Sequence, residues 1–398
     1  MTDTTTASAT ACLACGQDSA GVFFELKDIP VLANAPCTTR ERALSFPTGD
    51  VRLAFCPDCG HIFNTDFDPS RLQYDEFYEN SLHYSKLFDT YVRDLANDLV
   101  SRLDLHGKDI IEIGCGKGDF LALLCEIGAN RGVGFDPSYE PDRLQNGSTK
   151  RFQIVQELYS EAHSHLHCDL LCCRQVLEHI ARPQQFLAGL ANSLGSRSHS
   201  TDVFFEVPNA LYTLRHKGIW DIIYEHVSYF WSLPLRRLFE RSGFDVQDVR
   251  ESFGGQYLCL EAGPSRGPQS NGQDDAELAQ VTAEAEAFSQ TFRSTIDAAA
   301  EVLTDLRQRG RRAVVWSAGS KGVTFLNIFK HLGLLEYVVD INPHKQGRFI
   351  PGTGVEIVPP EFLKSFRPDL VFLMNPLYRE EICNQLSEMV LYPDLVAV

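Results

Sequence analysis

The chain has 398 residues, of which 44% are hydrophobic and 22% are charged, so it can build two or three packed domains and is not a disordered protein. Its formal net charge of −17 argues against nucleic acid and anionic membranes as main partners. No stretch approaches the ~20 consecutive apolar residues that span a bilayer.

The order of the motifs predicts four blocks. Residues 1–80 are rich in turns and have little helical periodicity. Residues 81–263 alternate short apolar runs with helical patterns, which predicts a doubly wound α/β sheet. Residues 264–309 begin with a linker rich in Pro, Gly and Ser and continue as one long amphipathic helix. Residues 310–398 alternate strands and helices again, which predicts a second, smaller Rossmann-like α/β domain.

Two C-x-x-C-G segments in the first block predict a metal site. They supply Cys12, Cys15, Cys56 and Cys59, and 40 residues lie between the two pairs. Four thiolates favour a tetrahedral structural zinc ion with no open position for water or substrate, whereas redox-active or incidental cysteines are the alternative. Residues 1–11 lack the basic start and apolar run of an export signal, so we expect a cytoplasmic protein with reduced cysteines.

A glycine-rich turn follows an apolar strand in the second block and leads into a helix. It carries Glu112, Gly114, Gly116 and Gly118, and the glycines let the backbone approach a ligand closely. The dinucleotide fingerprint needs a small residue where this chain has Asp119, which disfavours NAD at this turn.

This turn resembles the first motif of class I S-adenosylmethionine-dependent methyltransferases. The resemblance implies that Asp136, which closes the next strand, binds the ribose hydroxyls, and that Gln156 and Glu157 lie near the adenine. It also implies that the segment after the fourth strand lies near the sulfonium; this segment holds Arg174, Gln175, Glu178 and His179.

The segment 220–230 gathers phenols, carboxylates and an imidazole after the fifth predicted strand, above the ligand-binding edge of such a sheet. A histidine beside a carboxylate can act as a base near neutral pH, although a half-buried helix start is the simpler interpretation.

With this segment included, residues 12–385 resemble the sugar C-methyltransferases of deoxysugar biosynthesis. The resemblance implies a zinc-binding domain, bound S-adenosylmethionine and a nucleotide-linked 4-keto sugar. It makes His226 the base that forms an enolate and Glu225 its partner. It draws the enolate stabilisers from Tyr224, Tyr78, His83 and Tyr84.

Two departures from that family pattern concern the acceptor. The family tends to have Tyr-His before Glu-His, where this chain has Ile223 and Tyr224, and the stretch PVLANAPC at residues 30–37 is not assignable to the family.

The last block has its own turn, SAGSKG, a degenerate nucleotide-binding fingerprint or an empty relic of one. Lys321, Lys345 and Arg348 are the basic residues best placed to bind a diphosphate.

The sequence therefore predicts a small-molecule methyltransferase that transfers the methyl group to carbon, with S-adenosylmethionine and structural zinc as cofactors. The acceptor would be a nucleotide-linked keto sugar, or else a different natural product methylated at C, N or O. An NAD-dependent oxidoreductase working through the last block and a non-catalytic scaffold are the alternatives.

Overall fold

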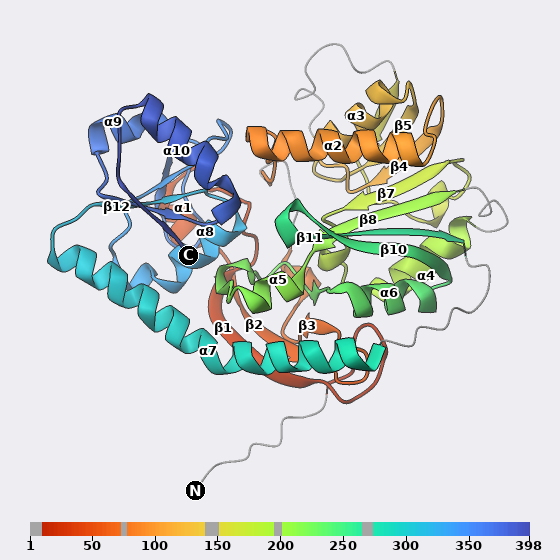
Figure 1. Cartoon of the computed structure of the whole chain (residues 1–398), viewed down its shortest axis with the longest axis horizontal. Helices are drawn as coiled ribbons and strands as arrows, with labels where there is room; N and C mark the ends of the chain where they lie inside the picture. Colours follow the sequence, from red (N-terminus) through yellow and green to blue (C-terminus); the bar gives the residue numbers. More distant parts are fainter. Residues whose placement is uncertain (1–9, 73–77, 140–150, 195–200, 265–273) are drawn as a thin grey trace, which may run out of the picture.

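The structure is a computed structural model, and it describes residues 10–72, 78–139, 151–194, 201–264 and 274–398. Most of the predicted linker, residues 264–275, lies outside these ranges. Within them, no helix is both long enough and apolar enough to cross a membrane. The described strands form three sheets, which we call the N-terminal, central and C-terminal sheets (Figure 1).

The central sheet is doubly wound. Its strand order is β10-β11-β8-β7-β4-β5-β6, and its strands from β6 to β8 run parallel, whereas β11 is antiparallel to both of its neighbours. These strands are β4 (Asp109–Ile113), β5 (Arg131–Phe135), β6 (Phe152–Val155), β7 (Leu170–Arg174), β8 (Asp202–Pro208), β10 (Phe244–Ser252) and β11 (Tyr257–Pro264). The strand order reverses between β4 and β7, where such sheets bind ligands. The predicted fold class, a class I methyltransferase sheet, is confirmed.

Helices cover both faces of this sheet because alternate strand residues point to opposite sides. Ile110, at one position of β4, packs with α2 (Lys86–Arg102) and α3 (Asp119–Ile127). Its neighbour Ile111 packs with α4 (Pro183–Leu194) and α6 (Ser232–Arg241). Short α5 (Ala210–Arg215) follows β8 and contacts the later helix α7 (Asp274–Gln308).

The N-terminal sheet has the order β1-β2-β3-β9 and is antiparallel. Its strands are β1 (Gly21–Pro30), β2 (Thr48–Phe55), β3 (Ile62–Asn64) and β9 (Ser228–Tyr229), and α1 (Arg40–Leu44) lies between the first two along the chain. The strand β9 follows β8 of the central sheet along the chain but pairs with β3 of the N-terminal sheet. The second sequence block thus supplies one strand to the sheet of the first block. The division into blocks at residues 80, 263 and 309 stays a prediction.

The C-terminal sheet has the order β14-β13-β12-β15-β16 and is parallel throughout. It contains β12 (Ala313–Trp316), β13 (Tyr337–Val339), β14 (Glu356–Val358), β15 (Leu370–Leu373) and β16 (Asp394–Ala397), with helices α8 (Ser320–Ile328), α9 (Leu363–Phe366) and α10 (Arg379–Glu388). The order of this sheet reverses between β12 and β15, so it has a ligand-binding edge of the same type as the central sheet.

A single long helix, α7 (Asp274–Gln308), connects the central and C-terminal sheets along one side of the molecule (Figure 1). It lies over the range for which the spacing of apolar residues predicts a helix. Its buried residues Phe288 and Leu303 belong to one apolar cluster that also includes Phe24 of β1 and Val315 of β12. The three sheets are therefore packed into one continuous body.

Candidate active site

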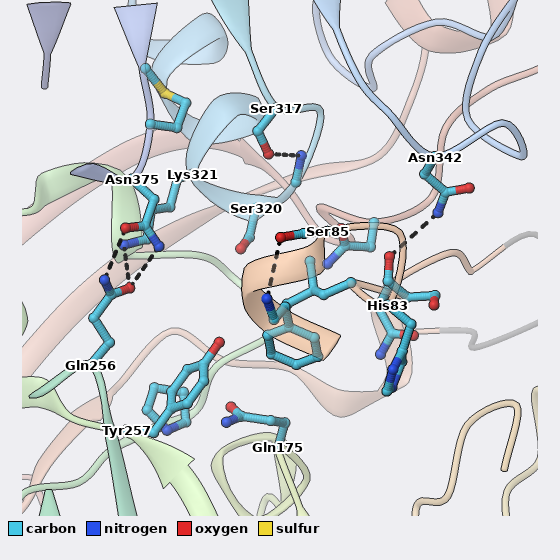
Figure 2. Close-up of a pocket in the computed structure, with 18 of the residues that line it drawn as sticks. His83, Ser85, Gln175, Gln256, Tyr257, Ser317, Ser320, Lys321, Asn342 and Asn375 are labelled. Carbon is cyan, nitrogen blue, oxygen red and sulfur yellow. Dashed lines mark hydrogen bonds between the residues drawn. The ribbon is translucent and has the colours of Figure 1, made fainter. Parts of the chain in front are cut away.

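A cavity of about 380 Å³ lies between the ligand-binding edges of the central and C-terminal sheets. One wall is formed by residues after β4 and β7, and the other by residues after β12, β13 and β15. Figure 2 shows Gln256 and Asn375 joined by hydrogen bonds beside Lys321, with Gln175 and Tyr257 below them in the view. The topology thus brings two separately wound sheets to one shared pocket.

The turn after β4 lines this cavity with Glu112, Gly114 and Gly116. Gly114 has φ of 68°, and a Cβ there would lie 2.2 Å from Val176 Cγ2, so no other residue fits. A Cβ on Gly116 would meet open space, as expected where a ligand approaches the backbone. These features fit the adenosyl end of S-adenosylmethionine.

Asp136 lies behind this turn and does not line the cavity. Its Oδ2 accepts a hydrogen bond from Gly116 N at 2.8 Å, and its Oδ1 accepts one from Ser138 N at 2.8 Å. The ribose role stays a prediction. Gly118 also lies outside the lining, where it caps the start of α3 with φ of 85°.

Gln156 and Glu157, predicted to lie near adenine, follow β6 and are exposed outside the cavity lining. The carboxylate of Glu157 instead lies 3.1 Å from His163 Nε2. We therefore leave both residues out of the site proposed below.

A buried network supports the wall near β7. Arg174 donates to Glu206 Oε1 at 2.9 Å, and its guanidinium lies 4.2 Å from the centre of the Phe120 ring. Gln175 donates to the same carboxylate at 3.1 Å and has a left-handed φ of 55°, which is uncommon for a residue with a side chain and is often associated with functional sites. Both Arg174 and Gln175 line the cavity, as does Glu112, and burial raises the pKa of Glu112 to about 8.

Three titratable side chains meet beside this wall. Ring nitrogens of His179 and His226 and a carboxylate oxygen of Glu178 lie within 4.8 Å of one another, and all three residues line the cavity. The two rings are 4.7 Å apart in a T-shaped arrangement. Burial lowers the pKa of His179 to about 4 and that of His226 well below its ordinary value. Both imidazoles are therefore neutral at physiological pH and can accept a proton.

Glu225 is fully buried and contacts His179, whereas the sequence paired it with His226. Its Oε1 accepts a hydrogen bond from Ala33 N at 2.9 Å, and its Oε2 accepts one from the Tyr78 hydroxyl at 2.8 Å. The Nδ1 atom of His179 lies 3.1 Å from the Glu225 carbonyl oxygen and 3.8 Å from Oε2. Glu225 therefore orients His179 and holds residues 33 and 78 against the site.

Of the four predicted enolate stabilisers, three line the cavity and one does not. Tyr224 is directed away from the cavity: its hydroxyl accepts from Asp68 N at 3.0 Å and its ring stacks on Phe67. The expectation that Tyr224 reaches the acceptor is corrected on this ground. Tyr78, His83 and Tyr84 do line the cavity, with His83 Nδ1 3.6 Å from Asp89.

On the opposite wall, the structure separates the three predicted basic residues. Lys321 lines the cavity and lies 3.0 Å from Asp221. Lys345 lines it too and is buried, donating to Ala318 O at 3.1 Å and to Asn34 Oδ1 at 3.3 Å. Arg348 lies outside the lining.

Sequence reasoning missed several polar residues of the pocket. Asn34 belongs to PVLANAPC, which had no assigned role, and reaches the cavity from the loop after β1. Gln256 and Asn375 exchange two hydrogen bonds of 2.9 Å between the central and C-terminal sheets. Asn375 comes two residues after the apolar strand β15, a position that is itself a signal for a ligand-binding edge.

Away from the cavity, the four cysteines of the C-x-x-C-G segments gather into one cluster. Their sulfur atoms lie within 4.8 Å of one another, and the Cys12–Cys59 and Cys15–Cys56 sulfur atoms are each 3.6 Å apart. That separation is too long for a disulfide and suits two thiolates on one tetrahedral ion with metal–sulfur bonds of about 2.3 Å. The donor set thus fits zinc.

Comparisons with known proteins match two families. A family described as "Methyltransferase domain" matches residues 88–249, and one described as "C-methyltransferase C-terminal domain" matches residues 271–391. C-methyltransferase NovU of Streptomyces niveus is 27% identical over 316 residues, which cover 75% of this chain and 74% of that protein.

Solved structures with similar folds include two with bound S-adenosylhomocysteine. Magnesium protoporphyrin IX methyltransferase of Synechocystis is 18% identical, covering 45% of this chain and 84% of its own, with a TM-score of 0.32. The 1,6-didemethyltoxoflavin N1-methyltransferase of Burkholderia thailandensis is 14% identical, covering 52% and 96%, with a TM-score of 0.34.

Proposed function

We propose that this chain, which matches a methyltransferase family over residues 88–249 and a C-methyltransferase family over residues 271–391, methylates the carbon next to the ketone of a nucleotide-linked keto sugar. One observation carries this proposal: the glycine turn after β4, the two neutral imidazoles and two lysines of the C-terminal wall line a single cavity. A nucleotide-linked sugar could span that cavity from the lysines to the imidazoles.

The cofactor end is assigned to the central sheet. Glu112, Gly114, Gly116, Arg174, Gln175 and His179 would hold S-adenosylmethionine, which supplies an electrophilic methyl group. Asp136 keeps the turn in shape through Gly116 N and is close enough in sequence and space to take the ribose role when a ligand binds.

At the acceptor end, His226 would take the proton from the carbon next to the ketone. Burial keeps this imidazole neutral at physiological pH, so its lone pair is available, but burial also weakens it as a base. The position of His226 in the cavity lining is therefore what supports this role. The electron pair of the broken C–H bond moves to the ketone oxygen and gives an enolate, whose carbon is the nucleophile. His226 later returns its proton to solvent.

The diphosphate of the acceptor would bind at the C-terminal wall. Lys321 and Lys345 are the basic residues of that wall that line the cavity, and both can form charge-assisted hydrogen bonds with phosphate. Arg348 is not part of this proposed subsite, since it lies outside the lining.

We also propose that Cys12, Cys15, Cys56 and Cys59 bind one zinc ion with a structural role. Four sulfur ligands leave no coordination position for a substrate, and the cluster lies apart from the cavity lining.

The test is methyl transfer to a nucleotide-linked 4-keto sugar, followed by mass spectrometry and by NMR to locate the new methyl group on carbon. His226→Ala should lose at least about a hundredfold in kcat, in line with the usual contribution of a general base. Its affinity for S-adenosylhomocysteine, measured by calorimetry, should stay within about twofold.

The products and ligands of the wild-type protein distinguish the alternative functions. Transfer to an N or O atom, or to an acceptor without a ketone, would exclude the enolate route while leaving methyl transfer itself intact. Binding of NADH without any binding of S-adenosylhomocysteine would favour an oxidoreductase instead. Equal activity of His226→Ala and wild type would remove the base assignment.

A further inference from the structure

Glu178 is a buried carboxyl group without a full set of hydrogen bonds. It lies in the single helical turn Leu177–His179 after β7, is 1% exposed and lines the cavity. Within the described residues its Oε2 atom has no hydrogen-bond partner. Burying a polar atom in this state costs about 1–3 kcal/mol, and such a cost is commonly met at a site that a ligand completes.

A backbone hydrogen bond holds Glu178 beside the two histidines. The N–H of Val227 donates to the Glu178 carbonyl oxygen at 2.8 Å, which joins the turn after β7 to the segment that carries His226. The carboxyl oxygen lies within 4.8 Å of ring nitrogens of both His179 and His226. A substrate atom in contact with His226 would therefore lie close to the carboxyl group of Glu178.

The groups that face Glu178 are acids and neutral bases. Glu206 has a basic partner, since Arg174 pairs with it at 2.9 Å, but the ion pairs of the described residues give Glu178 none. The titratable neighbours are His179 in the turn itself, Glu225 and His226 in the segment before β9, and Cys173 and Glu206 in the adjacent strands.

Burial and the neighbouring carboxylates determine the protonation states of Glu178, His179 and His226. Desolvation raises the pKa of Glu178 to about 8, and the carboxylates of Glu206 and Glu225 add to the effect. The two imidazoles have lowered pKa values for the same reason, since burial disfavours their charged forms. At neutral pH the cluster therefore consists of a carboxylic acid and two neutral imidazoles.

The proposed enolate needs a hydrogen-bond donor, and two of the three predicted tyrosines do not supply one. Tyr224 is directed away from the cavity, and the Tyr78 hydroxyl already donates to Glu225. A neutral carboxylic acid is a strong donor toward a developing oxyanion in an enclosed site. Glu178 is a donor of this kind beside the proposed base.

We propose that Glu178 is a catalytic residue that, as a neutral carboxylic acid, donates a hydrogen bond through Oε2 to the ketone oxygen of the acceptor. The proposal rests on the enolate chemistry proposed above. As His226 removes the proton, the C–H pair moves to that oxygen and the hydrogen bond from Glu178 strengthens. The carbon then forms its bond to the methyl group, the methyl–sulfur bond breaks, and the ketone is restored. Glu178 keeps its proton throughout.

The test compares Glu178→Gln with Glu178→Ala on the full-length protein with a nucleotide-linked 4-keto sugar. The amide of Gln keeps an N–H donor without a titrating group, so its kcat should stay within about tenfold of wild type. Loss of one oxyanion donor costs about 10²–10³ in kcat, so Glu178→Ala should fall by that factor. Activity of wild type should decline above pH about 8, as Glu178 ionises, and this decline should be missing in Glu178→Gln.

Two further measurements keep the result independent of turnover. Burial also raises the pKa of Glu112 to about 8, so the infrared comparison is made in the Glu112→Gln background: at pH 7 its spectrum should contain the carbonyl band of a protonated carboxyl group, and adding Glu178→Gln should remove that band. Exchange of the acceptor's acidic hydrogen for deuterium, measured without S-adenosylmethionine, should be slowed by Glu178→Ala. As a control, Glu161→Gln changes an exposed carboxylate outside the lining and should keep the wild-type pH profile.

The outcomes separate the two proposals. Full activity and exchange in Glu178→Ala would overturn the role of Glu178 and leave the proposed function standing. The role of Glu178 would also be overturned if the infrared band were absent and Glu178→Gln were as inactive as Glu178→Ala at every pH. Glu178 would then act as an anion. A wild type that neither exchanges nor methylates the keto sugar would refute the proposed function and this role with it.

Discussion

The hydroxyl of Tyr78 donates a hydrogen bond of 2.8 Å to Oε2 of Glu225, across 147 positions of sequence. Both residues are buried, and Glu225 in turn contacts the ring of His179. This contact links the chain before α2 to the segment of the proposed base, so it fixes the geometry of the acceptor end.

Replacing Tyr78 by Phe should therefore lower kcat more than it changes cofactor binding. A hydrogen bond to a buried charged group contributes about 2 kcal/mol, which corresponds to about thirtyfold in rate. Steady-state kinetics with both substrates varied should show this loss in kcat, with KM for S-adenosylmethionine nearly unchanged. Tyr392→Phe, at a residue that is 80% exposed, is the matched control and should behave as wild type. A rise in KM alone would contradict the positioning role.

Asp136 should matter to the affinity for cofactor. Asp136→Ala removes the acceptor for the Gly116 and Ser138 N–H groups and the proposed ligand of the ribose, so S-adenosylhomocysteine should bind about tenfold to a hundredfold more weakly. Isothermal calorimetry measures this directly. Asp305→Asn, which changes an exposed carboxylate of α7 paired with Arg309, should leave the affinity alone. Unchanged affinity of the Asp136 variant would count against the ribose role.

The cysteine cluster should bind one zinc ion per chain, measurable by elemental analysis of the purified protein. Cys56→Ser should lower both the zinc content and the melting temperature, the latter by about 5 °C or more, since a structural zinc site contributes several kcal/mol to folding. Cys383→Ser, a partly exposed cysteine of α10 outside the cluster, should do neither. A metal-free protein with full thermal stability would exclude the structural role.

The buried carboxyl of Glu112 should make the protein less stable as pH rises. Desolvation raises its folded-state pKa from 4.5 to about 8, so between these values the folded state holds a proton that the unfolded state has lost. The free energy of unfolding therefore falls with increasing pH, by up to about 1.4 kcal/mol per pH unit for this group. Glu112→Gln should remove that slope.

Chemical denaturation of the ligand-free protein at pH 5, 6, 7 and 8 tests this expectation. The stability advantage of Glu112→Gln over wild type should widen from the lowest to the highest of these pH values and level off above about 8. Parallel curves for the two proteins would mean that Glu112 titrates normally. Glu157→Gln, at an exposed carboxylate, serves as the reference variant.

The parts of the fold and site that depend on residues close in sequence could be predicted from local sequence patterns. The glycine turn at 114–118 is fixed by positive φ angles, and each C-x-x-C pair is held close by its own short spacer. Strand and helix periodicity was sufficient to predict the central sheet, because alternate residues of β4 do pack against opposite helical layers.

The remaining features depend on contacts between distant segments. The direction of the Tyr224 side chain is decided by its hydroxyl's bonds to residues 66 and 68, and no spacing within 220–230 reveals them. Asn34 enters the cavity because Glu225, 192 positions from Ala33, accepts a hydrogen bond from that residue's N–H. The sequence places Glu178 near the sulfonium, but it does not reveal that Oε2 has no hydrogen-bond partner among the described residues, because that depends on how the walls of the pocket assemble.

The strand β9 connects the second C-x-x-C-G segment, residues 56–60, to the segment that carries His226. Trp231 Nε1 donates to Gly60 O at 2.7 Å, next to Cys59, and the Ser228 hydroxyl lies 3.3 Å from His61 Nε2. His226 stands only two positions before that strand. If the four cysteines bind the proposed zinc ion, its removal by a chelator should also disturb the position of His226. Loss of activity on removal of the metal would then not show that the metal acts as a Lewis acid at the reacting carbon.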